Sequence, residues 1–121
     1  RLLETQGDIK KLTKEEKNLA KDAKNYMDRM YSRDIRIQDV AGILHVHPNY
    51  LSTLFRREYD QSPREYLRKV RMNQAKLLLA TTEYSISDIS SDVGYTNPFQ
   101  FSKVFKSCYG ISPTEYRNMR Q

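Results

Sequence analysis

Two stretches of the chain, PNYLSTLFRREYDQSPREY at residues 48–66 and PFQFSKVFKSCYGISPTEY at residues 98–116, are copies of one pattern at an offset of 50 residues. They share Pro, Ser, Phe and Tyr at matching positions, and both end in Ser-Pro-x-Glu-Tyr. The segments just upstream, residues 37–41 and 86–90, match at an offset of 49, so the turn in the second copy is one residue longer. A solenoid needs three or more repeats. The repeat therefore predicts two similar subdomains.

The signals around each copy are those of helices. Pro48 and Pro98 suit the first turn of a helix, where the missing N–H would have had no partner. Residues 13–16, 62–65 and 112–115 have the pattern of capping boxes. Because apolar residues recur at helical spacing between these signals, we expect an all-α fold of about seven helices and no sheet. The helices are expected over about 13–30, 37–44, 48–59, 63–80, 86–93 and 98–109, with a short final helix from 113.

Each copy reads as a short helix, a tight turn and a second helix with an apolar inner face. Ala41 and Ser90 are small residues at the point where the two helices of a copy would cross closely. This is the pattern of a helix-turn-helix, whose second helix enters the DNA major groove. An ordinary αα-hairpin has the same outline, so a single copy would leave the choice open. Two copies with polar outer faces favour DNA as the partner.

The composition points the same way. Among 121 residues there are 21 Lys and Arg against 15 Asp and Glu, a net charge of +6, which suggests a polyanionic partner. The basic excess is modest in every part of the chain, so a binding surface has to be made by folding. The longest apolar runs fall far short of the ~20 residues that cross a bilayer, and we expect no membrane association.

Other chemistry is sparse in the sequence. One cysteine, Cys108, leaves no internal disulfide and suits a reducing cytoplasm. We expect it to be a semi-buried structural residue, and the alternative is a redox sensor. His45 and His47 have no Cys or carboxylate cluster near them, so no metal site is predicted. The chain has no glycine-rich phosphate loop and no motif for a nucleophile with its base. We therefore expect neither an enzyme nor a cofactor.

The outer stripes of the two second helices are the candidates for base contacts. Asn and Gln suit adenine, Lys suits guanine, and Thr or Phe can meet a thymine methyl group. For Phe99 the alternative is packing against the helix that joins the two copies, and for Asn97 it is a helix N-cap. The predicted base-contacting residues are Asn49, Ser52, Thr53, Phe99, Gln100 and Lys103.

Contacts to the DNA backbone position a protein without reading sequence. Residues at the ends of the recognition helices and near the starts of the preceding helices are placed for this role, with help from helix N-terminal amides. The alternative for each is a solvated surface residue. The predicted backbone-contacting residues are Arg36, Arg56, Arg57, Ser87 and Lys106.

Residues 14–117 resemble the DNA-binding domain of the AraC/XylS family of bacterial transcription regulators. The most specific stretches lie in the second copy: SISDI at 85–89, VGY at 93–95, FSKVFK at 101–106 and GISPTEYR at 110–117. PNYLSTLF at 48–55 fits the family's first recognition helix, and Arg71, Ala75 and Leu78-Leu79 fit its linker helix. Four residues depart from the usual pattern, namely His45 for Gly, His47 for Ser, Ser90 for Ala and Tyr95 for Phe.

The resemblance implies two helix-turn-helix units joined rigidly by a helix. It maps the family's base-contacting positions onto Asn49, Ser52 and Thr53. It also implies a preceding sensing or dimerisation domain and activation through contact with RNA polymerase. The expected division is a linker from a missing N-terminal domain over 1–12, a first subdomain over 13–61, the linker helix over 62–82 and a second subdomain over 83–121.

The predicted function is sequence-specific regulation of transcription by a cytoplasmic bacterial protein that binds double-stranded promoter DNA at the nucleoid. Its recognition helices, about 48–59 and 98–109, are expected to enter successive major grooves, with centres roughly 34 Å apart. The alternative is a helical protein-interaction module whose basic face is incidental.

Overall fold

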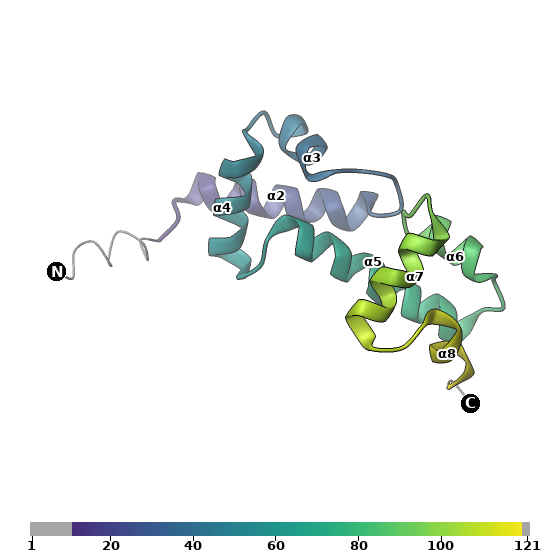
Figure 1. Ribbon diagram of the computed structural model, residues 1–121. Helices are drawn as coiled ribbons and strands as arrows, with labels where there is room; N and C mark the ends of the chain where they lie inside the picture. The colour runs from purple at the N-terminus through teal and green to yellow at the C-terminus, as the bar shows by residue number, and fades with distance from the viewer. Residues whose placement is uncertain (1–10, 120–121) are drawn as a thin grey trace.

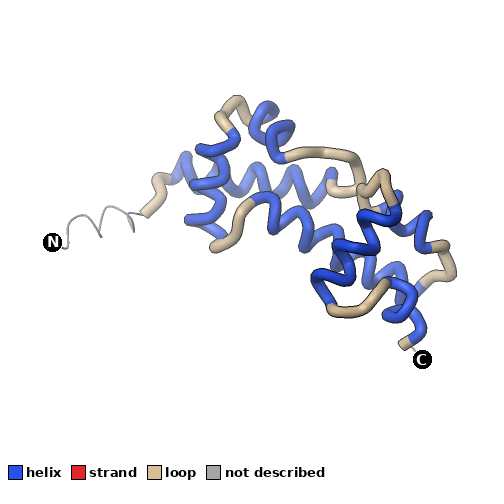
Figure 2. The backbone as a smooth tube through the Cα atoms, viewed as in Figure 1, coloured by secondary structure: helices blue, strands red, loops and turns tan. Residues whose placement is uncertain are grey.

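The structure is a computed structural model that describes residues 11–119. This range holds seven α-helices and no strand, which confirms the predicted fold class (Figures 1 and 2). Residues 1–10 of the predicted linker lie outside the described residues. The helices are α2 (Lys14–Met30), α3 (Ile37–Ile43), α4 (Pro48–Tyr59), α5 (Pro63–Thr81), α6 (Ile86–Asp92), α7 (Pro98–Tyr109) and α8 (Pro113–Asn118).

The starts of three helices are fixed by the predicted capping boxes. At α5 the Glu65 amide donates to the Ser62 hydroxyl at 3.1 Å, and the Ser62 amide donates to the Glu65 carboxylate at 2.7 Å. The boxes at Thr13 and Ser112 form in the same way. The hydrogen bonds from the backbone and the side chain of Ser62 lower the pKa of Glu65, and those from Ser112 lower the pKa of Glu115.

The first helix-turn-helix accommodates two residues that depart from the family pattern. His45 takes the left-handed backbone conformation with φ 61°, which non-glycine residues adopt less easily than Gly. His47 is the N-cap of α4, and its Nδ1 accepts a hydrogen bond from the Asn49 amide at 3.1 Å. A histidine thus supplies the acceptor that a serine side chain commonly supplies at this position.

The buried apolar residues form two clusters, one for each helix-turn-helix. α5 contributes to both, because Leu67 belongs to the first cluster and Met72, Ala75 and Leu79 belong to the second. Ala41 and Ser90 are buried at the helix crossings, as their small size predicts. We call the parts around the two clusters the first unit (α2, α3, α4 and the start of α5) and the second unit (the end of α5, α6, α7 and α8). The first cluster is Ala23, Met27, Val40, Ala41, Leu51, Phe55 and Leu67; the second is Met72, Ala75, Leu79, Ile89, Val93, Phe101 and Phe105.

The end of α5 supports the second unit as α2 supports the first. Ala23 and Met27 of α2 correspond to Ala75 and Leu79 of α5 at an offset of 52 residues, and all four are fully buried. The lysines at the matching surface position also correspond. The Lys24 ammonium lies 5.6 Å from the ring centroid of Tyr66, and the Lys76 ammonium lies 5.9 Å from that of Tyr116, the equivalent of Tyr66 in the second copy. The internal repeat therefore includes the supporting helices.

One expectation about an individual side chain is wrong. Cys108 was expected to be semi-buried, but it is exposed on α7. Spacing along one helix does not show how far the neighbouring helices cover its surface.

Among residues 11–119 no helix combines the length and apolar character needed to cross a membrane. In the same range no three His, Cys, Asp or Glu side chains are gathered so as to hold a metal ion.

Candidate nucleic-acid interface

The outer face of α4 is mostly polar, because Leu51 and Phe55 lie in the first cluster and Tyr50 is the large hydrophobic residue of α4 that stays exposed. Leu51, Leu54 and Phe55 are buried, whereas Asn49 and Thr53 are exposed and Ser52 is half-buried. The Thr53 hydroxyl donates to the Asn49 carbonyl at 3.0 Å, so its hydrogen is already used within the helix. The methyl group of Thr53 is then the part best suited to meet a base.

Basic residues follow along the same face of α4. Ser52, Thr53, Arg56 and Arg57 line a surface hollow of about 320 Å³. One Arg56 nitrogen lies 3.7 Å from a Glu65 carboxylate oxygen, and both side chains are largely exposed. An exposed pair at this distance contributes little to stability, so Arg56 keeps its freedom to contact another anion.

The outer face of α7 carries longer polar side chains. Gln100, Lys103 and Lys106 are exposed. Phe99 is 85% exposed, so the alternative of packing against α5 is wrong for this residue. Asn97 is the N-cap of α7, and its Oδ1 accepts hydrogen bonds from the amides of Phe99 and Gln100. The Phe99 ring is therefore accessible to a partner at this face of α7.

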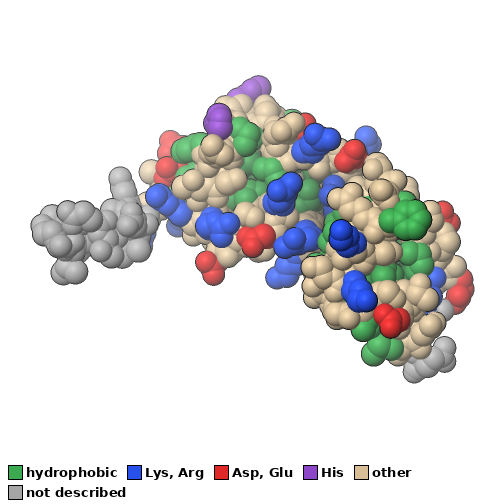
Figure 3. Space-filling model, viewed as in Figure 1, with side chains coloured by type: hydrophobic (Ala, Val, Ile, Leu, Met, Phe, Trp, Pro, Cys, Tyr) green, Lys and Arg blue, Asp and Glu red, His purple; other side chains and the backbone are tan. Residues whose placement is uncertain are grey.

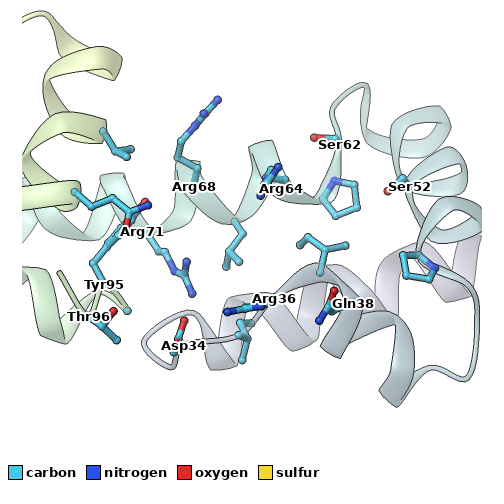
Figure 4. A pocket seen from close by; sticks show the side chains of 18 residues that line it. Asp34, Arg36, Gln38, Ser52, Ser62, Arg64, Arg68, Arg71, Tyr95 and Thr96 are labelled. Carbon is cyan, nitrogen blue, oxygen red and sulfur yellow. The ribbon is translucent and has the colours of Figure 1, made fainter.

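A groove of about 740 Å³ runs between the two recognition helices. Ser52 of α4 borders it at one end and Tyr95 lies at the other, with Gln100 of α7 also in its wall (Figure 4). Arg64 and Arg68 of α5 and Arg36 at the start of α3 line it between these ends. Of the six predicted base-contacting residues, Ser52 and Gln100 line this groove, and Asn49, Thr53, Phe99 and Lys103 do not.

Sequence reasoning missed the basic residues of α5. Arg64, Arg68 and Arg71 are spaced at i, i+4 and i+7, which places them along one stripe of the helix. That spacing is visible in the sequence and is the signal that could have found them. Figure 3 shows the result, with Lys and Arg side chains gathered over α5 and the helices beside it.

The predicted backbone-contacting residues are not all in one place. Arg36 lines the groove and precedes α3, where its main-chain amide donates to Asp39 at 2.8 Å. Ser87 is exposed in the first turn of α6, and it is not among the residues that line the groove. Lys106 is exposed in the last turn of α7. Of the five residues, Arg36 lines the groove, Arg56 and Arg57 line the smaller hollow on α4, and Ser87 and Lys106 line neither.

Two helix-turn-helix units whose polar second helices border one basic groove define a DNA-binding domain. A family model described as "Helix-turn-helix domain" matches residues 40–119. The chain belongs to this family, in its AraC type, which comprises the DNA-binding domains of transcription regulators rather than enzymes.

Curated relatives of the chain are regulators of greater length. It is 33% identical over 118 residues to the HTH-type transcriptional regulator YisR of Bacillus subtilis, covering 98% of this chain and 41% of that protein. It is 40% identical over 96 residues to the lactose operon transcription activator of Staphylococcus xylosus, covering 79% of this chain and 34% of that protein. The chain thus spans well under half the length of these relatives.

A solved structure of similar length has the same fold. The C-terminal domain of AraT, a response regulator from Geobacillus stearothermophilus, superposes with a TM-score of 0.82 at 36% identity. The match covers 85% of this chain and 86% of that one.

Proposed function

We propose that this chain is the sequence-reading part of a transcription regulator, and that it inserts α4 and α7 into two successive major grooves of double-stranded promoter DNA. The observation that supports this most is the shared groove, because residues from α4 and α7 border it on one side of the molecule. Two helices on opposite sides could not read one duplex. The division of the chain into units over 13–61 and 83–121 with a linker helix over 62–82 belongs to the same proposal.

The proposed base contacts differ in kind between the two helices. On α4 they are Asn49, Ser52 and Thr53, whose short side chains reach base edges only where the helix sits deep. On α7 they are Phe99, Gln100 and Lys103, where Gln and Lys reach adenine and guanine edges and Phe covers a thymine methyl group. The exposure of these α7 side chains supports this assignment.

The strand that crosses from one major groove to the next is proposed to run along α5. Arg64 and Arg68 line the groove there, and both side chains are exposed. They join the predicted phosphate contacts at Arg36, Arg56, Arg57, Ser87 and Lys106. Arginine suits this role because its planar fork matches phosphate oxygens.

The wider setting of the proposal comes from the relatives. One is named a transcription activator, and we infer that this protein also activates, through contact with RNA polymerase. The greater length of the relatives supports a sensing or dimerisation domain beyond this chain. DNA as the partner implies a protein of the bacterial cytoplasm that lies on the nucleoid when bound.

A selection of binding sites from random duplexes, followed by a salt titration on the selected site, tests the proposal. With ~6 phosphate contacts, affinity should fall by roughly 10³-fold between about 50 and 200 mM salt, because counterions are released on binding. The double variant Arg64→Ala, Arg68→Ala should lower the slope of log affinity against log salt by about 2 without changing the selected sequence. Substitution of Lys69, an exposed cation of α5 that does not line the groove, is the matched control. A flat salt response with no selected sequence would favour the protein-interaction module instead.

A further inference from the structure

Beside α5, a turn of the first unit lies against a turn of the second unit. The turn after α2 carries Tyr31 and Arg33 in the first unit, and the turn before α7 carries Gly94 and Tyr95 in the second. A Cβ atom on Gly94 would lie 2.3 Å from the Tyr31 carbonyl oxygen. The main chains of the two units are therefore so close at this point that position 94 has room for a glycine and not for a side chain.

Arg71 of α5 lies in this contact and bonds to the first unit. Its Nε donates to the Tyr31 carbonyl at 2.9 Å, and its Nη2 donates to the Arg33 carbonyl at 2.8 Å. These two carbonyls lie 40 and 38 residues away in the sequence. Two donors of one planar group are thus fixed on two acceptors of the same turn, a geometry that a lysine cannot reproduce.

The same guanidinium also contacts the second unit. Its central carbon lies 5.5 Å from the ring centroid of Tyr95, and its Nε is 2.9 Å from the point where a Gly94 Cβ would be. Burial lowers the pKa of Arg71, with the Tyr95 phenol and the Asp34 carboxylate acting in the opposite direction. The group stays charged, as arginine does in proteins, and it is held from both sides. We call Tyr31, Arg33, Arg71, Gly94 and Tyr95 the inter-unit contact.

We propose that Arg71 is a positioning residue that sets the distance and angle between α4 and α7, and thereby the number of base pairs that the protein accepts between its two half-sites. The proposal rests on the proposed function, since it concerns how the two recognition helices meet one duplex. Each recognition helix shares a buried cluster with residues of α5. A helix that is supported only at its buried face can twist or bend. The inter-unit contact, at one end of the groove, opposes that motion (Figure 4).

A second arginine provides a matched control. Arg117 of α8 donates from Nε to the Leu79 carbonyl at 3.3 Å and from Nη2 to the Thr82 carbonyl at 3.2 Å. These bonds have the same form as those of Arg71, but they lie wholly within the second unit. Loss of Arg117 therefore weakens the fold without loosening one unit against the other.

The first test measures binding to three duplexes that carry the selected half-sites at the selected spacing, one base pair longer and one base pair shorter. One base pair moves the second half-site by about 3.4 Å and turns it by about 35°. The unchanged chain should bind the altered spacings about tenfold or more weakly, the effect of a lost base contact. Arg71→Lys should reduce this ratio to about threefold or less, while Arg117→Lys should keep the ratio even where it lowers affinity on all three duplexes.

The second test needs no DNA, so it can be carried out even if Arg71→Lys abolishes DNA binding. Cys108 is the chain's single cysteine and is exposed on α7, and Glu58, at the offset of 50, is the equivalent exposed position on α4. Spin labels on Cys108 and on Glu58→Cys report the distance between the two recognition helices. The distribution should be narrow in the labelled parent and with Arg117→Lys, and broader with Arg71→Lys.

The outcomes separate the two proposals. An unchanged spacing ratio or an unchanged distance distribution with Arg71→Lys overturns the role of Arg71 and leaves the proposed function standing. Failure of the unchanged chain to prefer any sequence overturns the proposed function, and the spin-label measurement then still decides whether Arg71 holds the two units together.

Discussion

The two units use the same turns with different residues. Each has two positions in the left-handed backbone region, one after the first helix of the helix-turn-helix and one at the end of the recognition helix. In the second unit both are glycines, Gly94 with φ 98° and Gly110 with φ 82°. In the first unit the equivalent residues are His45 with φ 61° and Asp60 with φ 60°. The turn alone therefore does not require glycine.

The surroundings of the turn explain the difference at the first position. The turn at Gly94 packs against the Tyr31 carbonyl and Arg71, and it leaves no space for a side chain. The side chain of His45 is exposed. Nothing lies within 4 Å of a Cβ on Gly110, so this position is limited by its backbone angle alone. The comparison separates the cost of a left-handed backbone from the cost of a close approach.

The largest effect is expected at Gly94. Gly94→Ala combines a left-handed backbone with a clash against a main-chain oxygen, and we expect a loss of roughly 3–5 kcal/mol in the free energy of unfolding. Chemical denaturation followed by circular dichroism measures it. Gly110→Ala has the backbone cost only and serves as the control, at about 1–2 kcal/mol. Equal losses at the two glycines would show that the close approach to Tyr31 does not matter.

The two recognition helices are expected to differ in how they read bases. Lys103→Ala and Gln100→Ala should each cost about 1–3 kcal/mol of binding free energy on the selected site and much less on random DNA, because each removes a hydrogen-bonding side chain. At Thr53, Thr53→Val should change affinity by less than about 0.5 kcal/mol, whereas Thr53→Ser should weaken binding by about 1 kcal/mol, because the methyl group makes the contact.

Titration of each variant against the selected site and a scrambled duplex measures these effects. A large loss with Thr53→Val together with none with Thr53→Ser would assign the contact to the hydroxyl group. Uniform losses on all sequences would mean that these residues only position the protein.

An exchange at the ends of the recognition helices isolates the backbone cost. Gly110→Asp should cost about 1 kcal/mol or less, because Asp tolerates the left-handed region better than Ala does. Asp60→Gly should change stability by less than about 0.5 kcal/mol, because the relief of the backbone offsets the added entropy of glycine in the unfolded chain. Thermal unfolding of both variants beside Gly110→Ala provides the ranking. A greater loss with Asp than with Ala at position 110 would contradict it.

The smallest effect concerns acid stability. The capping hydrogen bonds lower the pKa of Glu65 and of Glu115 from 4.5, so each carboxylate stabilises the fold above that pH. This contribution is lost as the pH falls through the lowered pKa of the folded state. Glu65→Gln and Glu115→Gln should each reduce the slope of melting temperature against pH in the acid range, with the double variant flattest. Asp22→Asn, at an exposed position in α2 outside the capping boxes, supplies the control substitution. An unchanged slope in the double variant would contradict the role of the boxes.

The sequence by itself determined the helices, their caps and the outer stripes of the recognition helices. These features depend on residues within about one turn of each other, as in the hydrogen bonds between Ser62 and Glu65, and periodicity reads such local relations directly. The repeat at an offset of 50 residues added that two units share one architecture. The N-cap role of Asn97 could also be predicted from the sequence, because capping depends on residues that are neighbours in the chain.

Only the tertiary structure decided which residues meet across the two units. Phe99 is exposed and Arg71 donates to carbonyls about 40 residues away in the sequence, and both outcomes depend on how the helices cross. Arg64 and Arg68 form a stripe in the sequence, but their place in the groove between α4 and α7 follows from how the helices of both units pack together. Crossing angles are set by side chains from several helices interlocking at once, and spacing along one helix does not contain that information.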